Sequence, residues 1–156
     1  MKRVLWIALL AAGVWLLPRL SHPAVDLGKL EPVETVLLTA EEDGIRIETD
    51  TDAEGFGATL AEAIEDLQQG TGANVYLDTT NKLLIKGEME DYWGEILEFF
   101  RPSCHVYGVQ EKVDLMEVTE YLSVHKGTIT LNRIRAGEVA WVILEMKEGR
   151  GRLVGE

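Results

Sequence analysis

The stretch from Phe56 to Gly87 constrains the fold more than any other part of the chain, because it joins a helix pattern to two strand patterns. Thr59 and Glu62 have the spacing of a capping box, in which side chains satisfy free N–H groups of the first helical turn. Apolar residues then recur at helical spacing, at Leu60, Ala63, Ile64 and Leu67. Two short apolar runs follow, Val75–Leu77 and Leu83–Ile85, separated by a polar turn. The stretch is therefore predicted to form a helix, a tight turn, a strand, a turn and a strand.

The remaining elements can be predicted from the same kinds of pattern. Val33–Thr39 has strand composition and Ile45–Thr49 alternates strictly, so these two segments should pair as a hairpin. The other predicted elements are a helix over Glu88–Phe100, a strand over Ser103–Val109, a short helix opened by Asp114–Glu117, strands at Thr128–Leu131 and Val139–Leu144, and a closing strand at Arg152–Val154. Val139–Leu144 is apolar on both faces and is expected to lie centrally. The order of elements predicts an α+β or α/β fold, in which about three helices cover one face of a mixed β-sheet.

The chain is acidic and contains one cysteine. It has 156 residues, enough for one domain, and a net charge of −12. Residues 1–24 hold Lys2, Arg3 and Arg19 and no acidic residue, which leaves a charge of −15 on the remainder. A body this acidic is a poor partner for nucleic acid, because phosphate contacts need clustered lysine and arginine. Since Cys104 has no second cysteine, an intrachain disulfide and a thiolate metal cage are both excluded.

The N-terminus has the pattern of a membrane segment. Lys2 and Arg3 precede an uninterrupted run of apolar or small residues from Val4 to Leu17. The longer span from Val4 to Leu20 is about 25 Å long as a helix, at the short limit for crossing a hydrocarbon core. Residues 1–20 are predicted to be an uncleaved signal anchor that contacts the lipid bilayer through residues 4–20. A cleaved signal peptide and a buried helix of a soluble domain are the alternatives.

The charges that flank this segment predict its orientation. The positive-inside rule places the N-terminus in the cytoplasm and the chain from about Ser21 onward outside the cell membrane, which it would cross once. Residues 21–31 contain proline, glycine and scattered charges, and are interpreted as a linker. Residues 32–156 are expected to form a single extracytoplasmic α/β domain.

The candidate catalytic side chains do not form a recognisable constellation. Cys104 and His105 are neighbours on a predicted strand and should point to opposite faces, so they cannot act together as nucleophile and base. His125 stands alone in a segment expected to be an exposed loop. Neither histidine has a partner at a metal-binding spacing. No catalytic residue, cofactor-binding residue or metal ligand is assigned, no cofactor is expected, and the chain is predicted not to be an enzyme.

Two acidic turns remain as a possible binding feature. Asp50–Gly55 copies the opening of an EF-hand loop, but Ala61 stands where the bidentate glutamate should be, so an ordinary acidic turn is predicted. The carboxylates of Glu41–Asp43 and of Asp50–Glu54 would converge if the first hairpin brought the two turns together. Paired carboxylates can hold a cation. This gives the alternative hypothesis, a sensor domain that binds a small ligand or a cation at the cell surface.

Three segments resemble the N-terminal domain of the Ger(x)C family, the C subunit of spore germinant receptors. They are the helix Gly57–Leu67 with the strand Leu83–Ile85, the segment Ile96–Phe100 with the strand Val106–Val109, and the turn Gly151–Gly155. The family is usually longer and is anchored through a lipid-modified cysteine, which this chain lacks. A second resemblance is to the small ring-building domains of secretion and sporulation channels.

Both resemblances imply a component of a membrane assembly. We therefore expect a non-enzymatic, membrane-anchored, extracytoplasmic interaction domain, whose partner is a membrane protein complex of spore germination or sporulation. Exposed strand edges at the first hairpin or at Val139–Leu144 are expected to accept a strand of the partner.

Overall fold

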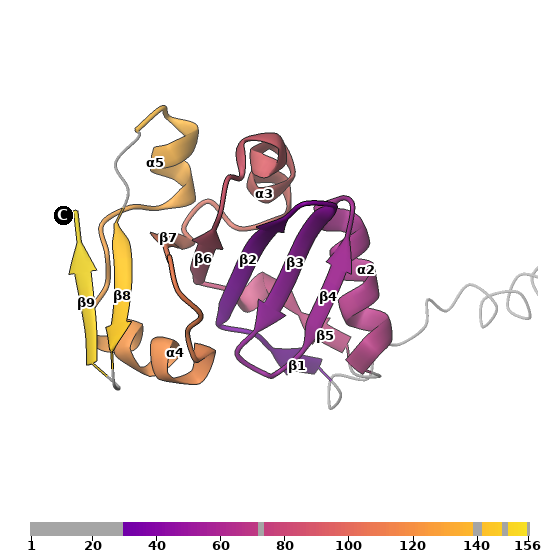
Figure 1. The fold of residues 1–156 in the computed structure, drawn as a ribbon, viewed down its shortest axis with the longest axis horizontal. Helices are drawn as coiled ribbons and strands as arrows, with labels where there is room; N and C mark the ends of the chain where they lie inside the picture. The colour runs from indigo at the N-terminus through magenta and orange to yellow at the C-terminus, as the bar shows by residue number, and fades with distance from the viewer. Residues whose placement is uncertain (1–29, 72–73, 139–141, 148–149, 156) are drawn as a thin grey trace, which may run out of the picture.

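The computed structural model describes residues 30–71, 74–138, 142–147 and 150–155, whose strands form one large and one small sheet (Figure 1). The large sheet has the spatial order β4-β3-β2-β6-β7-β8-β9. Its strands are β2 (Thr35–Glu41), β3 (Gly44–Thr49), β4 (Glu54–Gly57), β6 (Lys82–Lys86), β7 (His105–Gly108), β8 (Ile143–Lys147) and β9 (Arg150–Val154). The small sheet pairs β1 (Leu30–Pro32) in parallel with β5 (Asn74–Tyr76).

The described helices are α2 (Leu60–Thr71), α3 (Trp93–Phe99), α4 (Leu115–Val124) and α5 (Leu131–Arg135), with 3₁₀ turns at η3 (Leu77–Thr79) and η4 (Glu90–Tyr92). The large sheet is mixed. Strands β2, β6, β7 and β8 are parallel neighbours, whereas β3 is antiparallel to β2, β4 to β3, and β9 to β8. The predicted fold class, α+β with a mixed sheet and about three helices, is therefore confirmed.

Helices cover both faces of the sheet. On β2, Leu38 belongs to a core shared with α2 and α3, whereas its neighbour Leu37 belongs to a second core shared with α4. Leu83 and Leu84 of β6 divide between the two cores in the same way. Because successive side chains of a strand alternate between faces, a strand that is apolar throughout is buried on both sides. The prediction that helices cover only one face was wrong for this reason.

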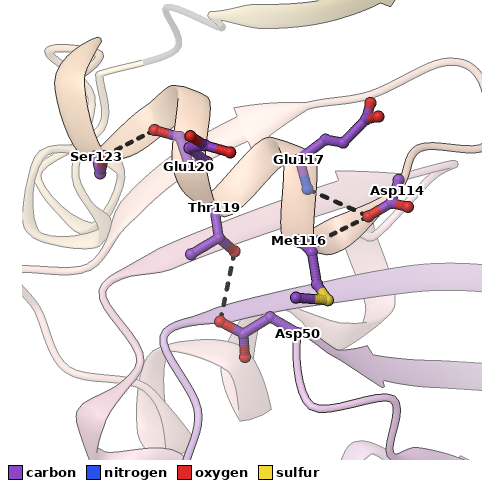
Figure 2. A pocket seen from close by; sticks show the side chains of 7 residues that line it. All are labelled: Asp50, Asp114, Met116, Glu117, Thr119, Glu120 and Ser123. Atoms are coloured by element: carbon purple, nitrogen blue, oxygen red, sulfur yellow. Dashed lines mark hydrogen bonds between the residues drawn. The ribbon is translucent and has the colours of Figure 1, made fainter. Parts of the chain in front are cut away.

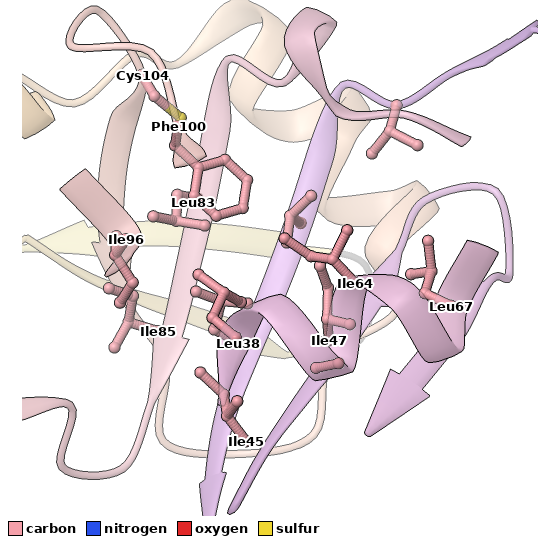
Figure 3. Close-up of a cluster of buried hydrophobic side chains, with 14 of the residues drawn as sticks. Leu38, Ile45, Ile47, Ile64, Leu67, Leu83, Ile85, Ile96, Phe100 and Cys104 are labelled. Carbon is pink, nitrogen blue, oxygen red and sulfur yellow. The ribbon is translucent and has the colours of Figure 1, made fainter. Parts of the chain in front are cut away.

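The larger core lies between the sheet and the helices α2 and α3 (Figure 3). Strands β2, β3 and β6 supply Leu38, Ile45, Ile47, Leu83 and Ile85, and the helical segments opposite supply Ile64, Leu67, Ile96 and Phe100. Full burial of one such side chain contributes about 1.5–3 kcal/mol to folding. The larger core therefore fixes α2 and α3 on one face of the sheet.

The best-specified stretch of the sequence folds as predicted at α2. The hydroxyl of Thr59 accepts a hydrogen bond from the backbone N–H of Glu62 at 3.2 Å, and the carboxylate of Glu62 accepts one from the N–H of Ala58 at 3.0 Å. The four apolar residues predicted to face inward, Leu60, Ala63, Ile64 and Leu67, are all buried. The hairpin predicted before the helix is also confirmed, as β2 and β3 pair antiparallel.

Several predicted elements differ from the observed ones. Thr128–Leu131 is not a strand: Thr130 forms an isolated bridge to His105, and α5 begins at the next residue. The N–H of Leu131 donates to the carbonyl of Cys104 at 2.9 Å as part of this bridge, and the N–H groups of Arg133 and Ile134 then turn back to the carbonyl of Thr130, which begins the helix. The helix predicted over Glu88–Phe100 is a 3₁₀ turn followed by the shorter α3.

The last strands also shift relative to their predictions. The predicted strand Val139–Leu144 starts in residues outside the described ranges, and the described strand β8 begins at Ile143. Strand β8 lies beside the edge strand β9 rather than at the centre of the sheet. The closing strand predicted at Arg152–Val154 is confirmed as part of β9.

The predicted signal anchor, residues 1–20, and most of the predicted linker lie outside the described residues. Leu30 and Glu31, which were assigned to the linker, belong to strand β1. In the part of the chain that the structure describes, no helix has both the length and the apolar character needed to cross a membrane.

Candidate functional site

Cys104 and His105 lie side by side in sequence but in different surroundings. The Cys104 side chain is fully buried in the larger core, and this burial raises the pKa of its thiol to about 12, although Arg101 and Lys82 favour the thiolate. Because the thiolate is the nucleophilic form, this thiol is unreactive at neutral pH. In His105, which begins β7, the Nδ1 atom is buried and has no hydrogen-bond partner among the described residues.

His125 is exposed at the end of α4, in agreement with the prediction of an exposed segment. Its ring lies on the ring of Tyr121, with the two centroids 4.5 Å apart. Within the described ranges, no group of three His, Cys, Asp or Glu residues is arranged so that it could hold a metal ion.

The two acidic turns do not converge, which corrects the geometry behind the alternative hypothesis. The first turn precedes β3 and the second follows it, so the extended strand separates them by about 16 Å. Arg46, in the middle of β3, contacts one carboxylate from each set: Glu41 at 2.6 Å and Glu54 at 3.8 Å. Its hydrogen bond to Glu41 holds the pKa of that carboxyl below the ordinary value.

The second acidic turn instead borders α4, where it forms an open groove (Figure 2). Two adjoining depressions of about 450 and 460 Å³ share Asp50, Asp114 and Met116. Together they are lined by seven carboxylates and one ammonium group: Glu48, Asp50, Asp52, Glu54, Asp114, Glu117, Glu120 and Lys112. The carboxylate of Asp114 also caps α4, because it accepts hydrogen bonds from the N–H groups of Met116 and Glu117. The groove therefore favours a cation.

Asp50 lies at the base of this groove and joins β2 to α4. Its Oδ2 accepts a hydrogen bond from the N–H of Thr35 at 3.1 Å and one from the hydroxyl of Thr119 at 3.4 Å. Its Oδ1 is buried and has no hydrogen-bond partner among the described residues. Burial raises the pKa of Asp50 above the ordinary value, and the hydrogen bonds from Thr35 and Thr119 oppose this shift. The carboxyl can thus accept one further hydrogen bond.

At one edge of the sheet, β4 is closed by helix α2. Gly55 has no side chain, which lets the helix backbone approach so closely that an added Cβ would overlap the carbonyl oxygen of Ala63. The N–H of Phe56 donates to Asp66 at 2.9 Å, and that of Ala58 donates to Glu62. Backbone donors that would otherwise attract another strand are therefore occupied by carboxylates of α2.

At the other edge, strand β9 is open (Figure 1). Only two residues separate Lys147 from its partner Arg150, which makes them a hydrogen-bonded pair. The antiparallel alternation then turns the N–H and C=O groups of Gly151 and Leu153 away from β8. In the described part of the chain, no hydrogen bond reaches this outer side of β9. The strand therefore presents unpaired backbone groups at the sheet edge.

The predicted docking edges were therefore misplaced. The first hairpin is flanked by β4 and β6, and β8 lies between β7, which it meets at Ile143, and β9, which pairs along its whole length, so neither is an edge of the sheet. The pattern of the glycine-rich, charged segment at the end of the chain predicts a strand, which is part of β9. The composition of a segment does not predict where its strand lies in the sheet. Asp50 was recognised as acidic, whereas its burial depends on Thr35 and Thr119, which lie far away in sequence.

Comparison of the chain with protein-family models, with curated proteins and with solved structures gives no match.

Proposed function

We propose that this chain is a non-enzymatic interaction domain, tethered to the outer face of the cell membrane by its N-terminal segment. It docks on a membrane protein complex when an extended segment of the partner adds to the free edge of β9. The open edge of β9 carries this proposal, because outward N–H and C=O groups at Gly151 and Leu153 supply the main-chain pairing that strand addition uses. The closed edge at β4 leaves β9 as the accepting edge of the large sheet.

The kind of complex follows from the sequence resemblances. The segments similar to the Ger(x)C domain and to ring-building domains support an assembly of spore germination or sporulation. The apolar run from Val4 to Leu20 supports the tether, with the domain on the extracytoplasmic side.

The test is site-specific photo-crosslinking of the full chain in the cells that produce it. A photoreactive residue replaces the half-exposed Val154 on β9 in one variant and the exposed Phe56 on β4 in a matched control, since the two strands lie at opposite edges of the large sheet. We expect a membrane-protein adduct from position 154 and none from position 56. Adduct formation at both positions, or at neither, would contradict docking through β9.

A second measurement tests whether the protein belongs to a spore complex, independently of whether it docks through β9. Purified spores and growing cells are fractionated, and the crosslinked product is located by its mass. Full-length protein in spore membranes, with its adduct, is the expected result. A shortened, soluble protein from growing cells would contradict both the anchor and the spore complex.

The acidic groove supports a second candidate, a sensor of a cation or small ligand. The observation that favours it is the buried Oδ1 of Asp50, which has no partner among the described residues at the base of a strongly acidic depression. Titration with calcium during thermal unfolding tests this function, because a ligand that binds the folded state raises the unfolding temperature. A rise of a few degrees at millimolar calcium is expected if the groove binds the ion, and an unchanged temperature would dismiss calcium as its ligand.

A further inference from the structure

The exposed face of the hairpin β8–β9 is cationic, although the chain as a whole is acidic. Arg150 and Arg152 of β9 and Lys147 of β8 are exposed, and Glu145 is the single exposed acidic side chain in the described residues of the two strands. The protein as a whole carries a net charge of −12. The free edge therefore differs in charge from most of the molecule.

The register shows that this positive charge is only partly compensated. Arg152 lies directly opposite Glu145, whereas Arg150 lies opposite Lys147, a like-charged pair that disfavours the hairpin. In the described residues, neither arginine of β9 forms an ion pair. A strand added outside β9 would place its own alternate side chains beside the two arginines. Carboxylates at those positions would supply the missing countercharge.

The opposite face of β9 is apolar and close to α4. The missing Cβ of Gly151 lies 2.6 Å from ring atoms of Tyr121, and Leu153 packs against the second core. An added strand would place its intervening side chains on this face, beside Tyr121 and Leu153. Small or apolar residues therefore fit between the carboxylates.

From this arrangement we infer that the segment that docks on β9 is an extended acidic peptide segment, with carboxylates at alternate positions and apolar residues between them. The inference rests on the proposed docking through β9 and adds the chemistry of the partner. A second copy of the chain is disfavoured at this edge, because pairing β9 with another β9 would bring arginines of the two strands together.

The test uses the full chain in nanodiscs of neutral lipid and three probes. The first is a blocked hexapeptide of alternating glutamate and valine, and the second has lysine in place of glutamate. The third is a vesicle containing anionic phosphatidylglycerol. Binding is measured by fluorescence anisotropy, and its location by amide hydrogen exchange at Gly151 and Leu153. We expect the glutamate peptide to bind at least about tenfold more tightly than the lysine peptide, with slower exchange at both amides.

Charge reversal makes the test specific. The double variant Arg150→Glu with Arg152→Glu should reverse the preference in favour of the lysine peptide, whereas Lys126→Glu, at an exposed lysine outside the hairpin, should leave it unchanged. Equal protection of Gly151 and Leu153 by both peptides would overturn the acidic specificity but leave docking through β9 intact. Protection by the anionic vesicle alone would overturn the inference in favour of a lipid surface. If neither peptide protects these amides, the acidic specificity is overturned as well. Crosslinking from position 154 then shows whether the partner docks on β9.

Discussion

The two ends of the large sheet are built in opposite ways. At the β4 end, helix α2 lies against the strand backbone, and its carboxylates occupy the outward N–H groups of Phe56 and Ala58. At the β9 end, α4 approaches through the ring of Tyr121, and the described residues leave the outer side of the strand unpaired. One edge is thus fixed by contacts with a helix backbone, and the other by a side chain that can move.

The molecule therefore tolerates an open strand edge at β9 but not at β4. An unpaired edge invites association with other strands, and proteins normally cover or block it. The edge at β4 is covered in two ways. Glycines in the strand let the backbone of α2 approach, and carboxylates of α2 accept hydrogen bonds from the N–H groups of Phe56 and Ala58. The edge at β9 instead has exposed arginines, which oppose pairing with a second copy of the same strand. Four variants test the comparison.

The largest effect is expected from Gly55→Ala, which breaks the closed end. Its Cβ would overlap the carbonyl oxygen of Ala63 and lie 2.5 Å from the backbone nitrogen of Leu67, and neither atom can move without shifting α2. We expect the free energy of unfolding to fall by about 3 kcal/mol, measured by urea denaturation. The control is Gly70→Ala in α2, where the nearest atom would lie 4.0 Å away. It should stabilise the protein by about 0.5 kcal/mol. Equal effects of both changes would show that α2 does not hold this edge.

The corresponding change at the open end, Gly151→Ala, should cost about half as much. The added Cβ would lie 2.6 Å from the ring of Tyr121, which is partly exposed and can rotate away. We expect a loss of about 1.5 kcal/mol in the free energy of unfolding. In a Tyr121→Ala background the same change should cost almost nothing, because the obstructing ring is gone. A cost that persists there would mean that the backbone, not the ring, limits the approach.

A third variant, Asp66→Ala, opens the β4 edge without changing its shape. It removes the acceptor of the Phe56 N–H, which should cost about 1 kcal/mol and speed the exchange of that amide. The outward amide of Leu153 should exchange fast in the original protein and stay unchanged in the variant. Glu65→Ala, at an exposed residue that bonds only to Gln69 in the described structure, is the control and should stay within about 0.5 kcal/mol. Fast exchange of Phe56 before any substitution would contradict the closed edge.

The elements that the sequence predicts well are those whose signals are local. Helix α2 was predicted because its cap and its apolar positions lie within one continuous stretch. Strand β4 was missed because Gly55 and Gly57 disfavour a strand by composition, and their use depends on the contact with α2. Helix α5 was missed because Thr130 pairs with the distant His105 in a single bridge only, after which the N–H groups of Arg133 and Ile134 bond to the carbonyl of Thr130.

The candidate site follows the same division. The residues of β9 could be predicted as a strand, but its place at the edge depends on how all the strands are ordered. Asp50 could be recognised as acidic, but its half-buried state requires Thr35 and Thr119 from other elements. Local sequence patterns therefore do not predict properties that arise from contacts between distant segments.

The smallest effect is expected from Asp50→Asn, which tests how α4, the helix near the β9 end, is held on β2. Burial raises the pKa of Asp50 above 3.8, so the folded protein holds this proton more tightly than the unfolded chain does. The carboxyl therefore stabilises the fold below pH 3.8, and this stabilisation is lost as the pH rises through the raised pKa. Asparagine keeps an oxygen acceptor for Thr35 and Thr119 and carries no charge. The variant should be more stable than the original protein at neutral pH, by less than about 1 kcal/mol.

This advantage should shrink as the pH is lowered through the raised pKa of Asp50, because the original carboxyl becomes protonated there. Asp43→Asn, at an exposed residue of the first hairpin, is the control and should show no such trend. Urea denaturation across the pH series measures both variants. A difference that stays constant with pH, or grows on acidification, would mean that the folded state does not disfavour ionisation of Asp50. The contact between α4 and β2 would then be as insensitive to pH as the apolar packing of α2 against the sheet.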